Sequence, residues 1–313
     1  MTSGKLELWL NADAGAITDA FGRVRQWKDQ SENRNDASQP TAASQPLLVF
    51  PPVLAGRPVI RFDGMLVASK PGFLTQRASI GPYLQGYGQV DVPGALTSFC
   101  VHMLAAPSSL ENLLWVVGEP KIFGEGRGDV ITDDVMRFSF WGYDYDADFK
   151  VPGGSYRIRA NRLAAGLNSI EMFDRTPAST NKFNMHTSGA RTFHPGYYIG
   201  GCDPCDKTFG RNFNGDIAEL IIYQGALDDS DLLAVIDYLQ DKYFPGQRLE
   251  GAALQWLFDG TNVAGATNAT LILTNACPAM SGAYSVMVSN AAGIVFSSNA
   301  VLSFRASAPS RSP

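Results

Sequence analysis

The sequence predicts an all-β protein with one substantial helix. Three observations lead to this fold class. Apolar residues alternate with other residues in the first segment, where Leu6, Leu8 and Leu10 share one face of a predicted strand. The chain contains 31 glycines and 18 prolines, a content typical of many turns. Helical spacing of apolar residues is clear only between residues 229 and 242.

The strands follow one another along most of the chain, separated by turn residues. An excursion at 65–97 is rich in glycine and proline and shows no clear period, so we expect a long surface loop there. The strands are predicted at 5–11, 24–27, 57–65, 97–105, 112–119, 135–144, 155–160, 168–175, 196–201 and 215–224.

The helix at 229–242 closes the first domain, which we place at 1–246. Asp228 or Ser230 can cap its start, and Lys242 lies in its last turn before Pro245. Its apolar face is formed by Leu232, Val235, Ile236 and Leu239.

A change of composition begins at Leu249, where small, apolar and uncharged polar residues dominate. Four further strands are predicted, at 253–258, 269–275, 283–290 and 293–304. We therefore predict a second domain at 247–305, followed by a linker or disordered tail at 306–313.

Four stretches of the first domain together resemble one family. The stretches "LELWLNADAG", "VRQWKDQSENRNDASQP", "RPVIRFDG" and "FNGDIAELIIYQGALDDSDLLAVIDYLQDKY" resemble the laminin-G-like, concanavalin A-like jelly-roll domains of bacterial surface and secreted proteins. The resemblance covers the two ends of residues 5–244 and only loosely the middle. It implies two curved antiparallel sheets whose first and last strands pair, and an extracellular or cell-surface location.

The second domain resembles the later part of a bacterial immunoglobulin-like domain. "QWLFDGTNVAGATNATLILTN" and "SGAYSVMVSNAAG" carry the resemblance, with Trp256 at the core position of strand C and Tyr284 at the tyrosine corner of strand F. Strands A and B have no room between Tyr243 and Leu254, so only strands C to G are expected. Such a partial sandwich would be a docking surface, within the molecule or by self-association through residues 249–304.

Charge and hydropathy exclude two kinds of partner. The net charge is −5 and the pI about 5.2, with no cluster of basic residues, so we expect no nucleic-acid partner. No apolar run reaches the length of a membrane span. No signal peptide is visible, so either the protein is intracellular or Met1 was placed where a mature domain begins. The family resemblance favours the second interpretation.

A run of acidic residues is the best candidate for a metal site. Asp144, Asp146 and Asp148 are two residues apart in "WGYDYDADF", so they would align on one face of a strand or gather in a loop. Carboxylate oxygens are the ligands that calcium prefers. The run therefore predicts a calcium site or, alternatively, a solvated acidic strand end.

Aromatic residues near the same run are candidates for sugar contact. A sugar ring stacks its C–H face on an aromatic ring, and its hydroxyls need polar partners. Ordinary sheet packing is the alternative for aromatic residues in strands. The predicted ligand-binding residues are Trp141, Tyr143, Tyr145, Tyr197 and Tyr198.

No catalytic constellation is apparent, so we expect no enzyme. The carboxylates Asp216 and Glu219 are three residues apart and would face opposite sides of a regular strand, unlike the paired acids of glycoside hydrolases. Cys202 and Cys205 suggest a loop disulfide or two plain thiols, and Arg-Gly-Asp at 127–129 would serve adhesion only on an exposed loop.

These observations give one leading function and two alternatives. The leading hypothesis is a non-catalytic extracellular module that recognises a glycan, or a cell-surface protein, through the rim of the jelly roll. The first alternative is a structural or adhesive surface or fibre subunit that associates by strand addition to the partial second domain. The second alternative is a glycoside hydrolase of the concanavalin-like fold.

Overall fold

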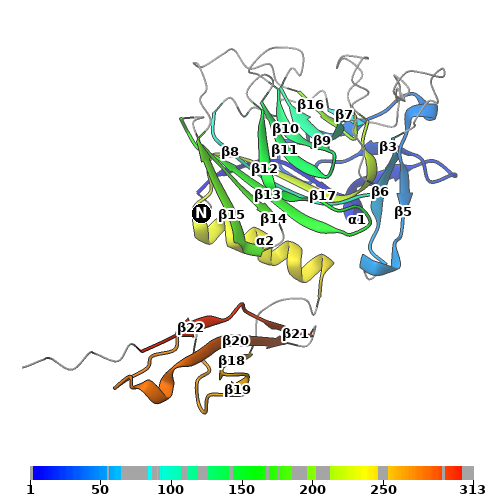
Figure 1. The fold of residues 1–313 in the computed structure, drawn as a ribbon. Coiled ribbons are helices and arrows are strands. Elements are labelled where there is room, and N and C mark those ends of the chain that lie inside the picture. Colours follow the sequence, from blue (N-terminus) through cyan, green and yellow to red (C-terminus); the bar gives the residue numbers. More distant parts are fainter. Residues whose placement is uncertain are drawn as a thin grey trace, which may run out of the picture. The chain divides into compact units, whose positions relative to one another are not determined.

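The chain folds into two compact units, Met1–Leu239 and Gln240–Pro313 (Figure 1). The predicted boundary at 246/247 and the predicted tail at 306–313 lie outside the described residues. The computed structural model describes residues 3–54, 56–64, 84–86, 90, 92, 94–106, 111–118, 126–140, 144–166, 169–174, 176–184, 196–201, 212–245, 253–268, 270–290 and 293–304.

The first unit is an antiparallel β-sandwich, which confirms the predicted fold class. One of its two layers is sheet A, in which the first strand pairs with the last, as the family resemblance implies. Among the described residues, sheet A contains, in spatial order, β15 (Thr176–Asn184), β14 (Ser169–Asp174), β13 (Arg157–Leu163), β8 (Leu96–Leu104), β17 (Asn214–Gln224), β6 (Val59–Asp63) and β5 (Leu47–Val49), with β1 (Lys5–Asn11) also pairing with β17.

Sheet B forms the other layer. It contains the short strand β7 inside the segment 65–97, which the sequence had suggested to be a loop without structure. Its strands, in spatial order, are β12 (Tyr145–Lys150), β11 (Val135–Phe140), β10 (Arg127–Thr132), β9 (Asn112–Val117), β16 (Tyr197–Ile199), β7 (Leu84–Gly86), β4 (Ala37–Ser38), β3 (Val24–Trp27) and β2 (Ala16–Thr18).

The short helical segments and the strands β2, β4, β5, β10, β12 and β15 were not predicted. The helical segments are α1 (Ala12–Gly15), η1 (Ala42–Ser44) and η2 (Pro52–Leu54). Strand β15 includes Pro177, which cannot donate a backbone hydrogen bond and is therefore tolerated at the edge of a sheet.

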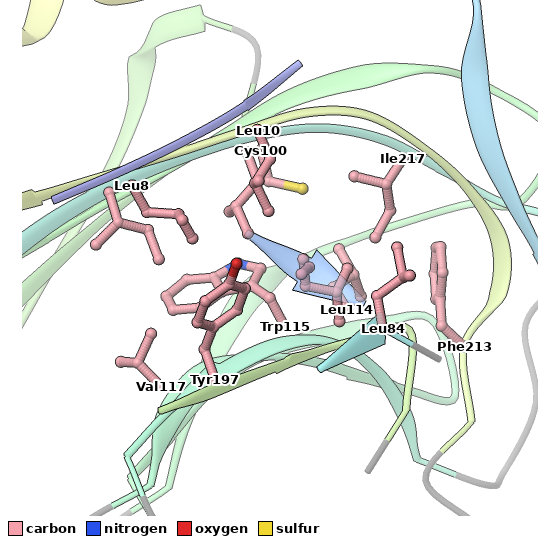
Figure 2. Packing of buried hydrophobic residues seen from close by; sticks show 14 of the residues in the cluster. Leu8, Leu10, Leu84, Cys100, Leu114, Trp115, Val117, Tyr197, Phe213 and Ile217 are labelled. Carbon is pink, nitrogen blue, oxygen red and sulfur yellow. The ribbon is translucent and has the colours of Figure 1, made fainter. Parts of the chain in front are cut away.

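The hydrophobic core lies between the two sheets (Figure 2). Leu8 and Leu10 project into it from β1, and Cys100 projects from β8. Trp115 and Tyr197 face them from sheet B. Leu8 and Leu10 thus lie inside as predicted, whereas a register shift between Leu6 and Leu8 takes Leu6 off their face. Cys100 is a buried free thiol, as predicted, and burial raises its pKa.

A polar network crosses this core and joins the two sheets. Asp129 of β10 accepts hydrogen bonds from Trp115 Nε1 at 3.0 Å and from Asn161 Nδ2 of β13 at 3.0 Å. Arg159 Nη2 donates to Asn161 Oδ1 at 2.7 Å, and Arg159 Nε lies 3.7 Å from Asp129 Oδ1. Asn161 also donates to Ser98 Oγ at 3.0 Å. Because Asp129, Arg159 and Asn161 are fully buried, each relies on the others for solvation.

His102 of β8 is also fully buried, and neither of its ring nitrogens has a hydrogen-bond partner among the described residues. Burial, reinforced by the positive charges of Arg157 and Arg159, lowers the pKa of His102 to about 3. The imidazole is therefore neutral in the folded protein at any pH near 7.

We expect this histidine to make the first unit sensitive to mild acid. The unfolded chain binds a proton below its ordinary pKa of 6.5, whereas the folded chain does not until about 3, so stability falls as the pH drops from 6.5 towards 3. The free energy of unfolding should be about 2 kcal/mol lower at pH 5 than at pH 7. Urea unfolding at both pH values measures it. His102→Leu should remove this part of the difference, and an unchanged difference would contradict the account.

Helix α2 (Asp229–Tyr243) covers the outer face of sheet A, and its bounds confirm the predicted helix (Figure 1). Asp228 accepts a hydrogen bond from the backbone N–H of Asp231 at 2.9 Å and so caps the helix, as expected. Tyr238 Oη donates to Glu219 Oε1 of β17 at 2.9 Å, which fixes the helix against the sheet. None of the described helices is long and apolar enough to cross a bilayer.

The second unit is built around a single sheet, sheet C, in the described residues. The predicted strand at 293–304 is divided into two short strands, and the predicted strand at 269–275 does not form. Tyr284 Oη donates to the carbonyl of Met280 at 2.9 Å, which is the bond expected of a tyrosine corner. Sheet C comprises β18 (Ala253–Phe258), β19 (Thr261–Asn262), β20 (Gly282–Asn290), β21 (Gly293–Phe296) and β22 (Ala300–Leu302), and the 3-10 helix η3 (Pro278–Met280) precedes β20.

Candidate functional site

The outer face of sheet B carries a row of residues that face away from the core. Strand pairing aligns Gln85, Tyr198, Val116, Gly128 and Ser139 across five neighbouring strands. Residues that pair directly share one face of a sheet. The row from Tyr198 to Ser139 crosses three strand spacings, or about 14 Å.

Gly128 is required in this row by the local backbone. A register shift next to Asp129 marks a β-bulge between β9 and β10. A Cβ atom at position 128 would lie 1.9 Å from the carbonyl oxygen of Trp115, so only glycine fits there.

A tight hairpin places the charged residues of this face. Asp133 and Asp134 connect β10 to β11 with positive φ angles of 50° and 67°, as a two-residue turn of the favoured hairpin type requires. The next hairpin pairs Arg137 of β11 with Asp146 of β12. Two successive hairpins thus bring residues within 20 positions of the chain onto one surface.

Arg137 is the centre of this surface. Its Nε donates to Asp146 Oδ1 at 2.6 Å and its Nη2 donates to Asp146 Oδ2 at 3.1 Å, a bidentate pair. Its Nη1 lies 3.6 Å from Glu111 Oε1 and 3.8 Å from Asp144 Oδ2. Ser139 Oγ donates to Asp144 Oδ1 at 2.9 Å. We call these five residues the Arg137 cluster.

The Arg137 cluster is negatively charged and partly open to solvent. Its three carboxylates and one guanidinium give a charge of −2. The side chains of Arg137 and Asp146 are 27% and 52% exposed. The hydrogen bond with Asp146 raises the pKa of Arg137. Partly exposed ion pairs contribute only about 0–1 kcal/mol to stability, so the concentration of charge here is not explained by folding.

The acidic run predicted to bind calcium supplies two members of the cluster. The guanidinium of Arg137 provides the positive charge that relieves repulsion between Asp144 and Asp146. The side chain of Asp148 lies outside the described residues. No group of three or more metal-ligating side chains occurs in the described part of the chain. Calcium binding at this run stays a prediction.

The predicted aromatic residues are divided between two faces. Trp141 and Tyr143 lie outside the described residues. Tyr145 packs against the core and is only partly exposed. Tyr197 also lies in the core, over Gly86, and its hydroxyl donates to the carbonyl of Asn35, which corrects its predicted place in a ligand site. Adjacent strand residues face opposite sides, so Tyr197 and Tyr198 cannot both be outside.

Tyr198 does lie on the outer face, three strand spacings from Ser139 of the Arg137 cluster. Its side chain packs with Leu113, Val116 and Val130 in a small buried apolar group. Its hydroxyl accepts a hydrogen bond from Gln85 Nε2 at 3.1 Å. Tyr198 therefore belongs to a separate buried apolar group and does not present an open ring.

Other predicted motifs are placed elsewhere. The Arg-Gly-Asp triplet lies within β10, and both Arg127 and Asp129 are buried. The triplet is therefore not on the exposed loop that an adhesive role would need. Cys202 and Cys205 lie outside the described residues.

The expected orientation of Asp216 and Glu219 is wrong, because β17 is not regular. A register shift between Ile217 and Glu219 pairs Asp216 with Met103 and Glu219 with Val101, which lie on one face of β8. Both acids therefore face outward from sheet A, and both are fully buried.

Each of these two acids is held by its own donors. Asp216 accepts from Arg61 at 2.7 and 2.8 Å and from the Tyr156 hydroxyl. Glu219 accepts from Trp9 Nε1 at 2.6 Å and from Tyr238. These contacts tie β17 to its neighbouring strands β6 and β1 and to helix α2, which is a structural role.

Arg137, Ser139 and Glu111 were not predicted as site residues. The signal for two of them was present in "VMRFSF", where Arg137 and Ser139 alternate with Met136 and Phe138. A hairpin between this segment and the acidic run would have brought them together. Glu111 precedes β9, and only the pairing of β9 with β10 places it nearby.

Comparison with solved structures supports the all-β sandwich. A tryptophan-to-alanine mutant of HCR D/C VPI 5995 is similar with a TM-score of 0.50 at 8% identity, over 91% of this chain and 71% of that chain. A botulinum neurotoxin serotype D/C binding domain has a TM-score of 0.46 at 10% identity, over 75% of this chain. This chain spans about half of it, 52%.

A smaller domain is similar over part of the chain. It is the Ruminococcus gnavus IT-sialidase CBM40 bound to α2,3-sialyllactose, with a TM-score of 0.36 at 17% identity, over 46% of this chain and 82% of that chain. No family model and no curated protein matches the sequence. At these identities the likeness concerns the fold alone.

Proposed function

We propose that this protein is a non-catalytic recognition module that binds a neutral glycan at the Arg137 cluster. The observation that carries the proposal is the concentration of three carboxylates, a guanidinium and a serine hydroxyl on one partly exposed patch of sheet B. Sugar hydroxyls both donate and accept hydrogen bonds. Carboxylate oxygens accept them, and the guanidinium donates them.

The charge of the cluster favours a neutral ligand over an acidic one. The cluster carries −2 and the whole chain −5, so both would repel an anionic sugar. The ligand of the Ruminococcus gnavus domain, α2,3-sialyllactose, contains a carboxylate. We therefore propose a ligand of a different charge class for this chain.

The family resemblance of the sequence supports the same proposal and adds a setting. Jelly-roll domains of this kind occur in surface and secreted bacterial proteins, so an extracellular or cell-surface location is part of the proposal. A glycoside hydrolase is the weaker alternative. The two acids of β17 that share a face, Asp216 and Glu219, are fully buried and bound by arginine, tyrosine and tryptophan donors.

Substitution of one cluster carboxylate tests the proposal. We expect Asp146→Asn to weaken binding of a neutral oligosaccharide about 10- to 100-fold, because a hydrogen bond to a charged group contributes about 1.5–3 kcal/mol. Asp134→Asn is the matched control, since Asp134 lies in the adjacent turn and pairs only with Lys150 in the described contacts. Titration calorimetry measures both variants, and equal affinities for the two would contradict the proposal.

A further inference from the structure

Sheet C has an apolar face that no second sheet covers in the described residues. Cross-strand pairs place Leu254 opposite Val288, Trp256 opposite Val286 and Phe258 opposite Tyr284, all on one face. Within residues 253–304, only Leu257 and Tyr284 are buried among the described side chains. β-Sheets bury an apolar face against another layer, so this face is suited to contact with a further layer.

The segment Thr270–Thr274 is a second feature of this unit that could be paired. Its sequence, "TLILT", is rich in β-forming residues and predicts a strand, yet no strand forms. Leu271 and Leu273 are half-buried, whereas Ile272 between them is 77% exposed. None of the described backbone hydrogen bonds involves this segment. A strand-forming sequence therefore lies at the surface with its backbone donors and acceptors open for pairing.

The near absence of charge in residues 253–304, which carry sheet C, indicates the kind of partner. Asp259 is the only charged residue between Ala253 and Phe304. A partner recognised by charge would find nothing to complement here. A second copy of the same surface meets no like-charge repulsion, and surfaces with almost no charge tend to self-associate.

We propose that two copies of this chain associate by antiparallel pairing of their Thr270–Thr274 segments. An antiparallel strand pair related by a two-fold axis is self-complementary, because its donors and acceptors alternate identically in both copies. An axis through the centre of the segment places Ile272 directly opposite Ile272 of the second copy. The exposed isoleucine then gains a cross-strand apolar contact.

A charge at this position tests the pairing. Sedimentation equilibrium of the full chain over a series of concentrations should show a monomer–dimer equilibrium. Ile272→Lys places like charges opposite each other and should raise the dimer dissociation constant at least about tenfold. Ala264→Lys adds the same charge at an exposed turn of the same unit and should leave it unchanged.

Cysteine trapping tests the register independently. In a background in which Cys202, Cys205 and Cys277 are replaced by serine, Ile272→Cys should form an intermolecular disulfide under mild oxidation, because directly opposed Cβ atoms lie about 4.5–5.5 Å apart. Ala264→Cys in the same background should not. A monomer at every concentration, or a dimer that Ile272→Lys leaves intact, overturns the proposal. A dimer that dissociates with added salt also overturns it, since the proposed interface is uncharged.

Discussion

Asp129→Ala should destabilise the first unit by about 3–5 kcal/mol, the largest effect that we expect from a single substitution. The alanine leaves the guanidinium of Arg159 fully buried without its carboxylate, and it removes the acceptor for Trp115 and Asn161. Because Asp129 belongs to sheet B and Arg159 to sheet A, the loss also removes a link between the layers.

A double variant separates the net contribution of the ion pair from the cost of breaking it. Asp129→Leu combined with Arg159→Met should recover much of the stability that Asp129→Ala loses. Well-packed apolar residues often replace a buried ion pair with little change in the free energy of unfolding. Asp146→Asn, in a partly exposed pair, should change stability by at most about 1 kcal/mol. Urea unfolding followed by tryptophan fluorescence measures all three. A loss below about 1 kcal/mol for Asp129→Ala would contradict the network.

Asp29→Ala should have the second largest effect, about 2–4 kcal/mol. Asp29 is 5% exposed and accepts four hydrogen bonds. Its Oδ1 accepts from the N–H of Trp9 at 2.8 Å and of Ser31 at 2.9 Å. Its Oδ2 accepts from the N–H of Asn35 at 2.8 Å and from Ser31 Oγ at 2.7 Å. The alanine variant leaves these donors without their acceptor and frees the loop after β3 from β1.

Two further variants check this interpretation in the same unfolding assay. Asp29→Asn keeps one acceptor oxygen and should lose about half as much stability as the alanine variant. Glu32→Ala changes an exposed residue of the same loop and should stay within about 0.5 kcal/mol of the parent. A larger effect from Glu32→Ala than from Asp29→Ala would show that the loop is held differently.

The sequence predicted the sandwich well because its strands alternate clearly. Leu8 and Leu10 face the core, and the segment at 229–242 forms the helix, since both follow directly from local periodicity. The pairing of β1 with β17 followed from the family resemblance and not from periodicity. The local signals and the fold agree in these elements except at Leu6, where a register shift in β1 breaks the alternation.

The same alternation rule failed wherever the strand was irregular. The bulge in β17 brings Asp216 and Glu219 to one face although they are three residues apart. A bulge is set by the neighbouring strands, so the separation of two residues in the sequence cannot reveal it. The segment 269–275 failed for another reason, because a strand needs a partner as well as a β-prone sequence.

The candidate site was only half predictable. Asp144 and Asp146 were identified from their spacing, but Arg137 reaches them through a hairpin register that the spacing does not contain. Tyr197 and Tyr198 were both assigned to the ligand, although neighbouring strand residues must face opposite sides. The buried network around Asp129 gave no local signal, because its members come from four strands in two sheets.

The central claim, recognition of a neutral glycan at the Arg137 cluster, is tested most directly on a glycan array. The array should pair neutral oligosaccharides with their sialylated forms and be probed with the parent protein and with Asp144→Asn and Asp146→Asn. We expect binding to neutral glycans, weaker binding to the sialylated forms, and loss of binding in both variants. Absence of binding to every glycan, or a preference for sialylated glycans that both variants retain, would contradict the claim.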